Sequence, residues 1–92
     1  MTDYRPEHFE PLIGTVFAIE HAEPPLDLTL NAVRPLPVSK RPGGGFALDF
    51  SGPATPMLGQ GIVTLSQGNA RHDLFLVPTG RDELGRYEAV FN

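Results

Sequence analysis

The chain has 92 residues, a formal net charge of −4 and no cysteine. A chain of this length holds one hydrophobic core, so we expect a single domain over residues 1–92. The absence of thiols excludes disulfides, cysteine-ligated metals and cysteine nucleophiles, and the acidic balance argues against nucleic-acid binding.

The N-terminal segment predicts one short helical turn. Phe9, Leu12 and Ile13 recur at spacings of three and four residues, as they would on one face of a helix. Pro11 within this segment and Gly14 after it are expected to keep the helix short.

Two β-strands are predicted next, because apolar residues alternate with polar ones over 15–19 and over 26–30. Pro35 and Pro37 are expected to end the second strand, since proline removes a hydrogen-bond donor from a ladder. The residues predicted to face inward are Thr15, Phe17, Ile19, Leu26, Leu28 and Leu30.

The middle of the chain predicts two further strands. Residues 39–45 (SKRPGGG) read as a flexible hairpin loop, 46–52 as the third strand and 62–68 as the fourth. In the connection between these strands we expect Met57 and Leu58 to lie beneath the core. The third strand should direct Phe46, Leu48 and Phe50 inward and Asp49 and Ser51 outward.

The fifth predicted strand lacks alternation, because Leu74, Phe75, Leu76 and Val77 are all apolar. A regular strand places Leu74 and Leu76 on one face and Phe75 and Val77 on the other. We expect the core to cover one pair and the N-terminal turn to cover the other. If the turn instead plugs an open end of a barrel, the outer pair stays bare beside an edge strand, which favours self-association or docking onto a larger partner.

The last predicted strand alternates Tyr87, Ala89 and Phe91 with Glu88 and Val90. In a closed barrel, we expect this closing strand to meet the first one. Six short strands, separated by many of the ten Gly and ten Pro, predict an all-β fold. The pattern leaves open an antiparallel barrel or a small sandwich, in either case with a short N-terminal helix.

No arrangement of residues predicts catalysis. His8, His21 and His72 could join nearby carboxylates in a metal site, but they form neither an HxxxH nor an HExxH pattern, so we expect surface residues. The PGGG run at 42–45 precedes a strand instead of a helix, which argues against a phosphate site. The carboxylates considered are Glu7, Glu10, Glu23 and Asp73, and the serines, which lack a GxSxG motif, are Ser39, Ser51 and Ser66. We therefore predict no catalytic, cofactor-binding or metal-binding residue.

The expected location is the cytoplasm. No apolar run approaches the roughly eighteen residues that span a bilayer, and the first ten residues are too polar and acidic for a signal peptide. The acid-free basic patch, formed by Arg34, Lys40 and Arg41, is too small to indicate nucleic-acid binding. We expect neither membrane nor nucleic acid as a partner.

Two classes of function remain open. The first is a non-enzymatic structural or interaction domain with a protein partner, bound through an exposed edge strand or by self-association. The second is a small-ligand or carbohydrate-binding β-domain, with Tyr4 and the loop from Arg34 to Gly45 as its rim. A flat apolar strip would favour a protein partner, whereas a concave site with converging polar groups would favour a ligand.

Three stretches of the chain, HFEPLIGTVF, FALDFSGP with LGQGIVTL, and LFLVPTGRDELGRYEAVFN, resemble a family of small bacterial proteins described as a domain of unknown function. The resemblance covers nearly the whole chain, and the block ending in YEAVFN is its most specific part. Members of that family look like accessory genes beside phage-tail-collar or microcystin-dependent-type proteins. The resemblance implies a part or assembly helper of a tail-like particle, and it implies no catalytic residue.

Overall fold

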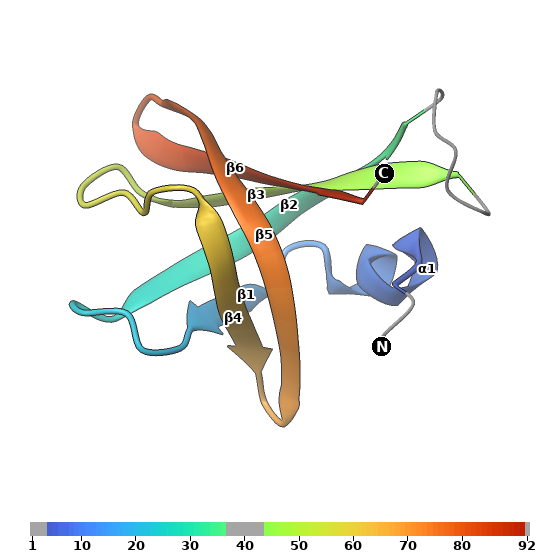
Figure 1. The fold of residues 1–92 in the computed structure, drawn as a ribbon, viewed down its shortest axis with the longest axis horizontal. Coiled ribbons are helices and arrows are strands. Elements are labelled where there is room, and N and C mark those ends of the chain that lie inside the picture. The colour runs from blue at the N-terminus through green and yellow to red at the C-terminus, as the bar shows by residue number, and fades with distance from the viewer. Residues whose placement is uncertain (1–3, 37–43, 92) are drawn as a thin grey trace.

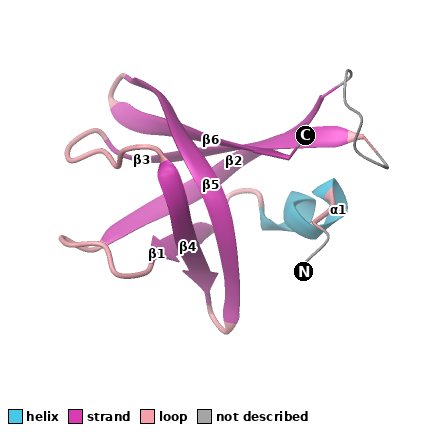
Figure 2. Cartoon of the chain, in the orientation of Figure 1, coloured by secondary structure: helices cyan, strands magenta, loops and turns pink. Residues whose placement is uncertain are grey.

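Six antiparallel strands close into a barrel in the computed structural model, which describes residues 4–36 and 44–91 (Figure 1). The short helix α1 (Pro6–Phe9) and the 3-10 helix η1 (Glu10–Leu12) precede the strands. The strands are β1 (Val16–Ile19), β2 (Leu26–Leu36), β3 (Gly45–Pro53), β4 (Gly61–Gln67), β5 (Ala70–Arg81) and β6 (Leu84–Phe91). The predicted all-β class with one short N-terminal helix is confirmed, and the fold is a barrel, not a sandwich (Figure 2).

The core lies inside this barrel and follows the predicted alternation on β2 and β6. On β3 the expectation that Ser51 faces outward is wrong, because this strand is paired on both sides and Ser51 is only 7% exposed. Burying an aliphatic or aromatic side chain of this size stabilises a fold by about 1.5–3 kcal/mol. Met57 and Leu58 are partly buried and pack against the core, as expected. The fully buried large side chains are Tyr87, Phe9, Phe17, Phe46, Phe50, Leu28, Leu30, Leu48, Leu65 and Leu76.

The second strand is longer than predicted. It continues through Pro35, which lies opposite Phe46, and is described as far as Leu36, with a register shift at Asn31. Pro37, the other proline expected to end this strand, lies outside the described residues. The expectation that Pro35 ends the strand is wrong because β1 pairs with β2 only as far as Thr29. Beyond that point, among the described residues, β2 has β3 on one side and no paired strand on the other, and such an edge tolerates proline.

The position predicted for the closing strand is also wrong. Strand β6 lies between β3 and β5, and the barrel closes instead between β1 and β4. Two register pairs form this closure, Ala18 with Ser66 and Ile19 with Leu65. The tight turn between β5 and β6 makes these strands neighbours, which leaves the β4 edge of the hairpin to meet β1.

The N-terminal turn enters one end of the barrel instead of covering its outside. Phe9 is 1% exposed, and its ring centroid lies 5.5 Å from that of His72 and 6.1 Å from that of Phe91. Leu74 and Leu76 face the core, but Phe75 is 52% exposed. The prediction that both faces of β5 are covered is therefore wrong at Phe75, whereas Val77 on the same face is half-buried. The turn plugs the barrel end, as in the alternative, and leaves the outer face bare at Phe75.

Candidate functional site

Strand β5 separates from β6 halfway along its length. The two strands pair from Arg81 opposite Gly85 to Val77 opposite Glu88, and the residues of β5 before Val77 pair with β4 alone. Helix α1 lies in the opening between β5 and the C-terminal half of β6 (Figure 1). Within residues 4–36 and 44–91, one side of β5 therefore has no paired strand along its first half.

The direction of the backbone groups on β5 follows from one hydrogen bond in the barrel closure. The N–H of Glu20 donates to the C=O of Thr64 at 2.9 Å, so the backbone N–H and C=O of Thr64 point toward β1. The backbone groups of the next residue, Leu65, therefore point the other way, toward β5. Leu65 lies opposite His72, so the backbone N–H and C=O of His72 point toward β4. The alternate residues Arg71, Asp73 and Phe75 therefore direct their N–H and C=O groups away from β4, to the side without a paired strand. We call these three residues the open β5 edge.

An apolar pair lies on the outer face beside this edge. Ile62 of β4 is directly opposite Phe75 of β5, and the two side chains are 76% and 52% exposed. Residues directly opposite on antiparallel strands have touching side chains, so together they form one apolar surface. The run from Leu74 to Val77 already signalled this surface, because a strand covered on one face has no need of apolar residues on both.

A hollow of about 630 Å³ adjoins the open β5 edge. Thr64 donates a hydrogen bond to Oδ1 of Asp73 at 2.6 Å, and Arg71 pairs with Glu20 at 2.5 Å. Tyr4 also lines the hollow. The hollow is thus polar, with one ion pair between Arg71 and Glu20 and one hydrogen bond from Thr64 to Asp73.

His72 connects the N-terminal segment to β5. Its Nδ1 lies 3.3 Å from the hydroxyl of Tyr4, and its ring packs edge-on against the rings of Tyr4, Phe9 and Phe17. Burial among these groups lowers the pKa of His72 from its ordinary value of 6.5, and the nearby His8 lowers it further. The structure thus favours the neutral imidazole.

The free energy of unfolding should consequently fall with pH below 6.5. Because the pKa of His72 is lower in the folded protein than in the unfolded chain, the unfolded chain takes up this proton at a higher pH. The contribution of His72 to stability is therefore complete above pH 6.5 and is lost as the pH falls toward the pKa of the folded state. Urea unfolding at a series of pH values tests this, and His72→Gln should flatten the decline. His21→Asn is the matched control, because His21 has φ 64, which Asn also adopts readily. A decline of equal size in His72→Gln would contradict the assignment.

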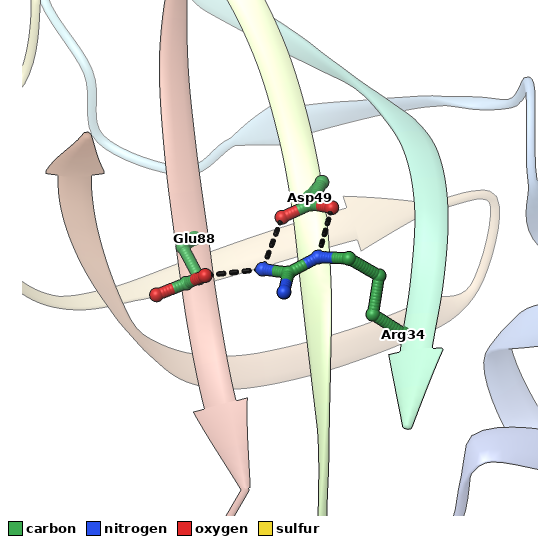
Figure 3. Close-up of polar contacts among 3 residues, drawn as sticks. All are labelled: Arg34, Asp49 and Glu88. Carbon is green, nitrogen blue, oxygen red and sulfur yellow. Dashed lines mark hydrogen bonds and ion pairs between the residues drawn. The ribbon is translucent and has the colours of Figure 1, made fainter. Parts of the chain in front are cut away.

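Arg34 belongs to an ion-pair network and not to a free basic patch. It donates from Nε and Nη2 to the carboxylate of Asp49 at 2.6 and 2.9 Å, and Nη2 also pairs with Glu88 (Figure 3). These hydrogen bonds, to Asp49 first and then Glu88, raise the pKa of Arg34. Lys40 and Arg41 lie outside the described residues.

Arg34→Met should cost about 1 kcal/mol or less in unfolding free energy, since the network is exposed and screened by water. The loss arises because Asp49 and Glu88 then face each other without a cation. The difference from the parent should shrink in high salt. Arg86→Met is the matched control, because Arg86 approaches Asp82 only to 3.4 Å, and it should change little. Equal losses in both variants at every salt concentration would contradict this role for Arg34.

The other predicted site residues are dispersed. Nδ1 of His8 accepts the N–H of Arg5 at the start of α1, and His21 is an exposed turn residue after β1. No group of three His, Asp or Glu side chains suited to a metal ion occurs within 4–36 and 44–91. Ser51 is buried, Ser66 bonds to the C=O of Ala18 at 3.5 Å, and Ser39 lies outside the described residues.

The predicted ligand rim is not assembled in the described residues. Tyr4 is half-buried against Phe9, Phe91 and His72, and most of the loop from Arg34 to Gly45 lies outside the described residues, as does most of the SKRPGGG segment. In the part of the chain that the structure describes, no helix is both long and apolar enough to cross a membrane.

Fold and site together define a small antiparallel β-barrel with an N-terminal plug and one open strand edge. The chain belongs to the family described as domain of unknown function DUF6916, whose profile matches residues 4–91. The predicted membership in a family of unknown function is thereby confirmed. Neither the curated proteins nor the solved structures contain a match to this chain.

Proposed function

We propose that this domain is a non-enzymatic structural or interaction domain whose partner is another protein. The observation that carries the proposal is the apolar pair of Ile62 and Phe75, exposed on the outer face of the β4–β5 hairpin beside an open strand edge. Exposed apolar groups beside unpaired strand edges are features that protein interfaces cover. Nucleic acid is not proposed as a partner because the net charge is −4, and no membrane partner is proposed.

A more specific role is part of the same proposal. We place the domain in the cytoplasm as an accessory or assembly component of a phage-tail-like particle. This role rests on the resemblance of the block LFLVPTGRDELGRYEAVFN to small bacterial proteins that look like neighbours of phage-tail-collar genes. Particle assembly needs many specific protein contacts and no chemistry from each component, which suits a small barrel with an exposed edge.

A small-ligand or carbohydrate-binding domain is the second candidate, favoured by the hollow beside Tyr4. Its volume of about 630 Å³ is within the range of ligand sites. However, Arg71 already pairs with Glu20, and Oδ1 of Asp73 already accepts a hydrogen bond from Thr64. A ligand would have to compete with these pairs, so we rank this candidate below a protein partner.

The test is capture of partners from a lysate of the source organism by the immobilised domain. The parent should retain a defined set of proteins that mass spectrometry identifies, and Ile62→Asp combined with Phe75→Asp should lose that set. Both side chains are exposed, so the variant is expected to remain folded. Leu84→Asp is the matched control, because Leu84 is 40% exposed and lies on β6 outside the apolar pair.

Structural proteins of a tail-like particle among the captured set would support the more specific role. Capture of the same set by the parent and by the double variant would overturn the proposal for this surface. Binding of an oligosaccharide with loss on Tyr4→Ala, and with no protein captured, would favour the second candidate.

A further inference from the structure

We propose that the open β5 edge binds an extended segment of a partner protein as an added antiparallel strand, with an apolar residue opposite Phe75 and a basic residue opposite Asp73. This inference deepens the proposed function and rests on it. It names the chemistry of the partner as well as the place where it binds.

The backbone of the open edge supplies the affinity. Arg71, Asp73 and Phe75 each direct one N–H and one C=O to the side without a paired strand, as the register of β4 and β5 requires. An added strand satisfies such groups through main-chain hydrogen bonds, which is how peptides bind at other exposed sheet edges. The antiparallel direction is chosen because every neighbouring pair in the barrel is antiparallel and such ladders are the more stable.

The side chains on the outer face supply the specificity. A residue directly opposite Phe75 shares its face, where the ring and the neighbouring Ile62 offer an apolar contact. A residue directly opposite Asp73 meets a carboxylate whose Oδ1 is occupied by Thr64. The exposed Oδ2 can then pair with Lys or Arg. Read from its N-terminus, the partner strand has the pattern apolar, any residue, basic.

No described strand occupies the position of this added strand. Strand β5 pairs with β6 only from Val77 to Arg81, so the open β5 edge has no strand partner among the described residues. Arg71 and Asp73 of this edge also line the hollow, together with Tyr4. The added strand would therefore lie beside a polar hollow and the exposed ring of Phe75.

A second copy of this chain that pairs about a twofold axis at Asp73 does not offer the basic residue that this position favours. Two β5 edges paired about a twofold axis at Asp73 would place that carboxylate opposite its own copy. Like charges directly opposite each other destabilise a strand pair. The charge of Asp73 therefore favours a partner with a basic residue at that position.

Two synthetic peptides test the proposal, with amide signals followed by NMR. The first, capped at both ends, has the sequence TVTKTV and places Val opposite Phe75 and Lys opposite Asp73. The second, TVTETV, differs only in the charge. We expect TVTKTV to shift the amide signals of Arg71, Asp73 and Phe75 and to bind up to about fivefold more tightly than TVTETV.

Two variants distinguish strand addition from other modes of binding. Asp73→Lys should reverse the preference, so that TVTETV binds more tightly than TVTKTV. Phe75→Pro removes the N–H that faces the open side and leaves the ladder to β4 intact, because Leu74 and Leu76 face β4. This variant should remain folded and lose binding, whereas Phe75→Leu should retain it.

Several results would overturn the inference. The inference is wrong if millimolar peptide shifts no amide signal of the open edge. It is also wrong if both peptides bind with equal affinity, or if Phe75→Pro binds as tightly as the parent. Shifts of the same amides on raising the concentration of the domain alone would assign the edge to a second copy. If Phe75→Pro still captures the partners that depend on Ile62, the proposed function stands and strand addition is wrong.

Discussion

A chain that lacks residues 87–92 is expected not to fold. The deletion removes the part of β6 that pairs with β3 from Phe50 back to Phe46, together with Tyr87 and Ala89, which are each 1% exposed. Loss of one buried aromatic side chain costs about 3–5 kcal/mol, and the whole stability of a small domain is about 5–15 kcal/mol. Circular dichroism and the dispersion of amide NMR signals would show the loss of folded protein.

Single substitutions separate the contributions to this effect. Tyr87→Ala should cost about 3 kcal/mol or more, because the ring is buried and its hydroxyl accepts the N–H of Leu58 at 2.8 Å. Tyr87→Phe keeps the ring and should cost about 1 kcal/mol. Phe91→Ala should also destabilise, through loss of the ring stacked on Phe46 at 4.5 Å. A shortened chain with the melting temperature of the parent would show that this strand does not hold the barrel together.

Phe9→Ala should destabilise the barrel by about 3 kcal/mol, although Phe9 belongs to no strand. Its ring fills the end of the barrel between Phe46 and His72, and it is 1% exposed. Removal leaves a cavity among aromatic rings that the surrounding strands cannot close without bending. Urea unfolding followed by circular dichroism gives the loss directly.

The matched control for Phe9 is Ile13→Ala. Ile13 lies in the same N-terminal segment but is 46% exposed, so its truncation should change the unfolding free energy little. Phe9→Leu should fall between the two variants, because it restores part of the buried volume. If Phe9→Ala and Ile13→Ala had equal small effects, the N-terminal segment would not be part of the core.

The sequence predicts the local structure of this protein better than it predicts which strands lie next to each other. Period-two alternation predicts the core residues of β2 and β3, and Leu28 and Phe50 are buried as expected. On β3 the other face is also largely covered, since Ala47 and Ser51 are buried too. The same pattern says nothing about which strands pair. The position of β6 between β3 and β5 depends on long-range pairing, so the expectation that it meets β1 was wrong.

The candidate site was only partly predictable for a related reason. The apolar run from Leu74 to Val77 signalled that one face of β5 needs a cover, and the bare outer face was one of the two alternatives it left. The open edge itself arises because β5 pairs with β6 only from Val77 onward, and no local pattern encodes where that pairing begins. The ion pairs of Arg34 likewise join residues up to 54 positions apart in the chain.

The barrel closure has a consequence for the motions of the native state. Strands β1 and β4 meet at two register pairs, whereas β3 pairs with β6 over its whole length from Phe46 to Pro53. Ser66 and Ala18 are 48 positions apart, so the chain loses considerable entropy when this seam forms. The seam should therefore open locally at a free energy well below that of global unfolding. The native protein then samples a curved open sheet, and the amide of Glu20 exchanges with solvent deuterium long before those in the middle of β3.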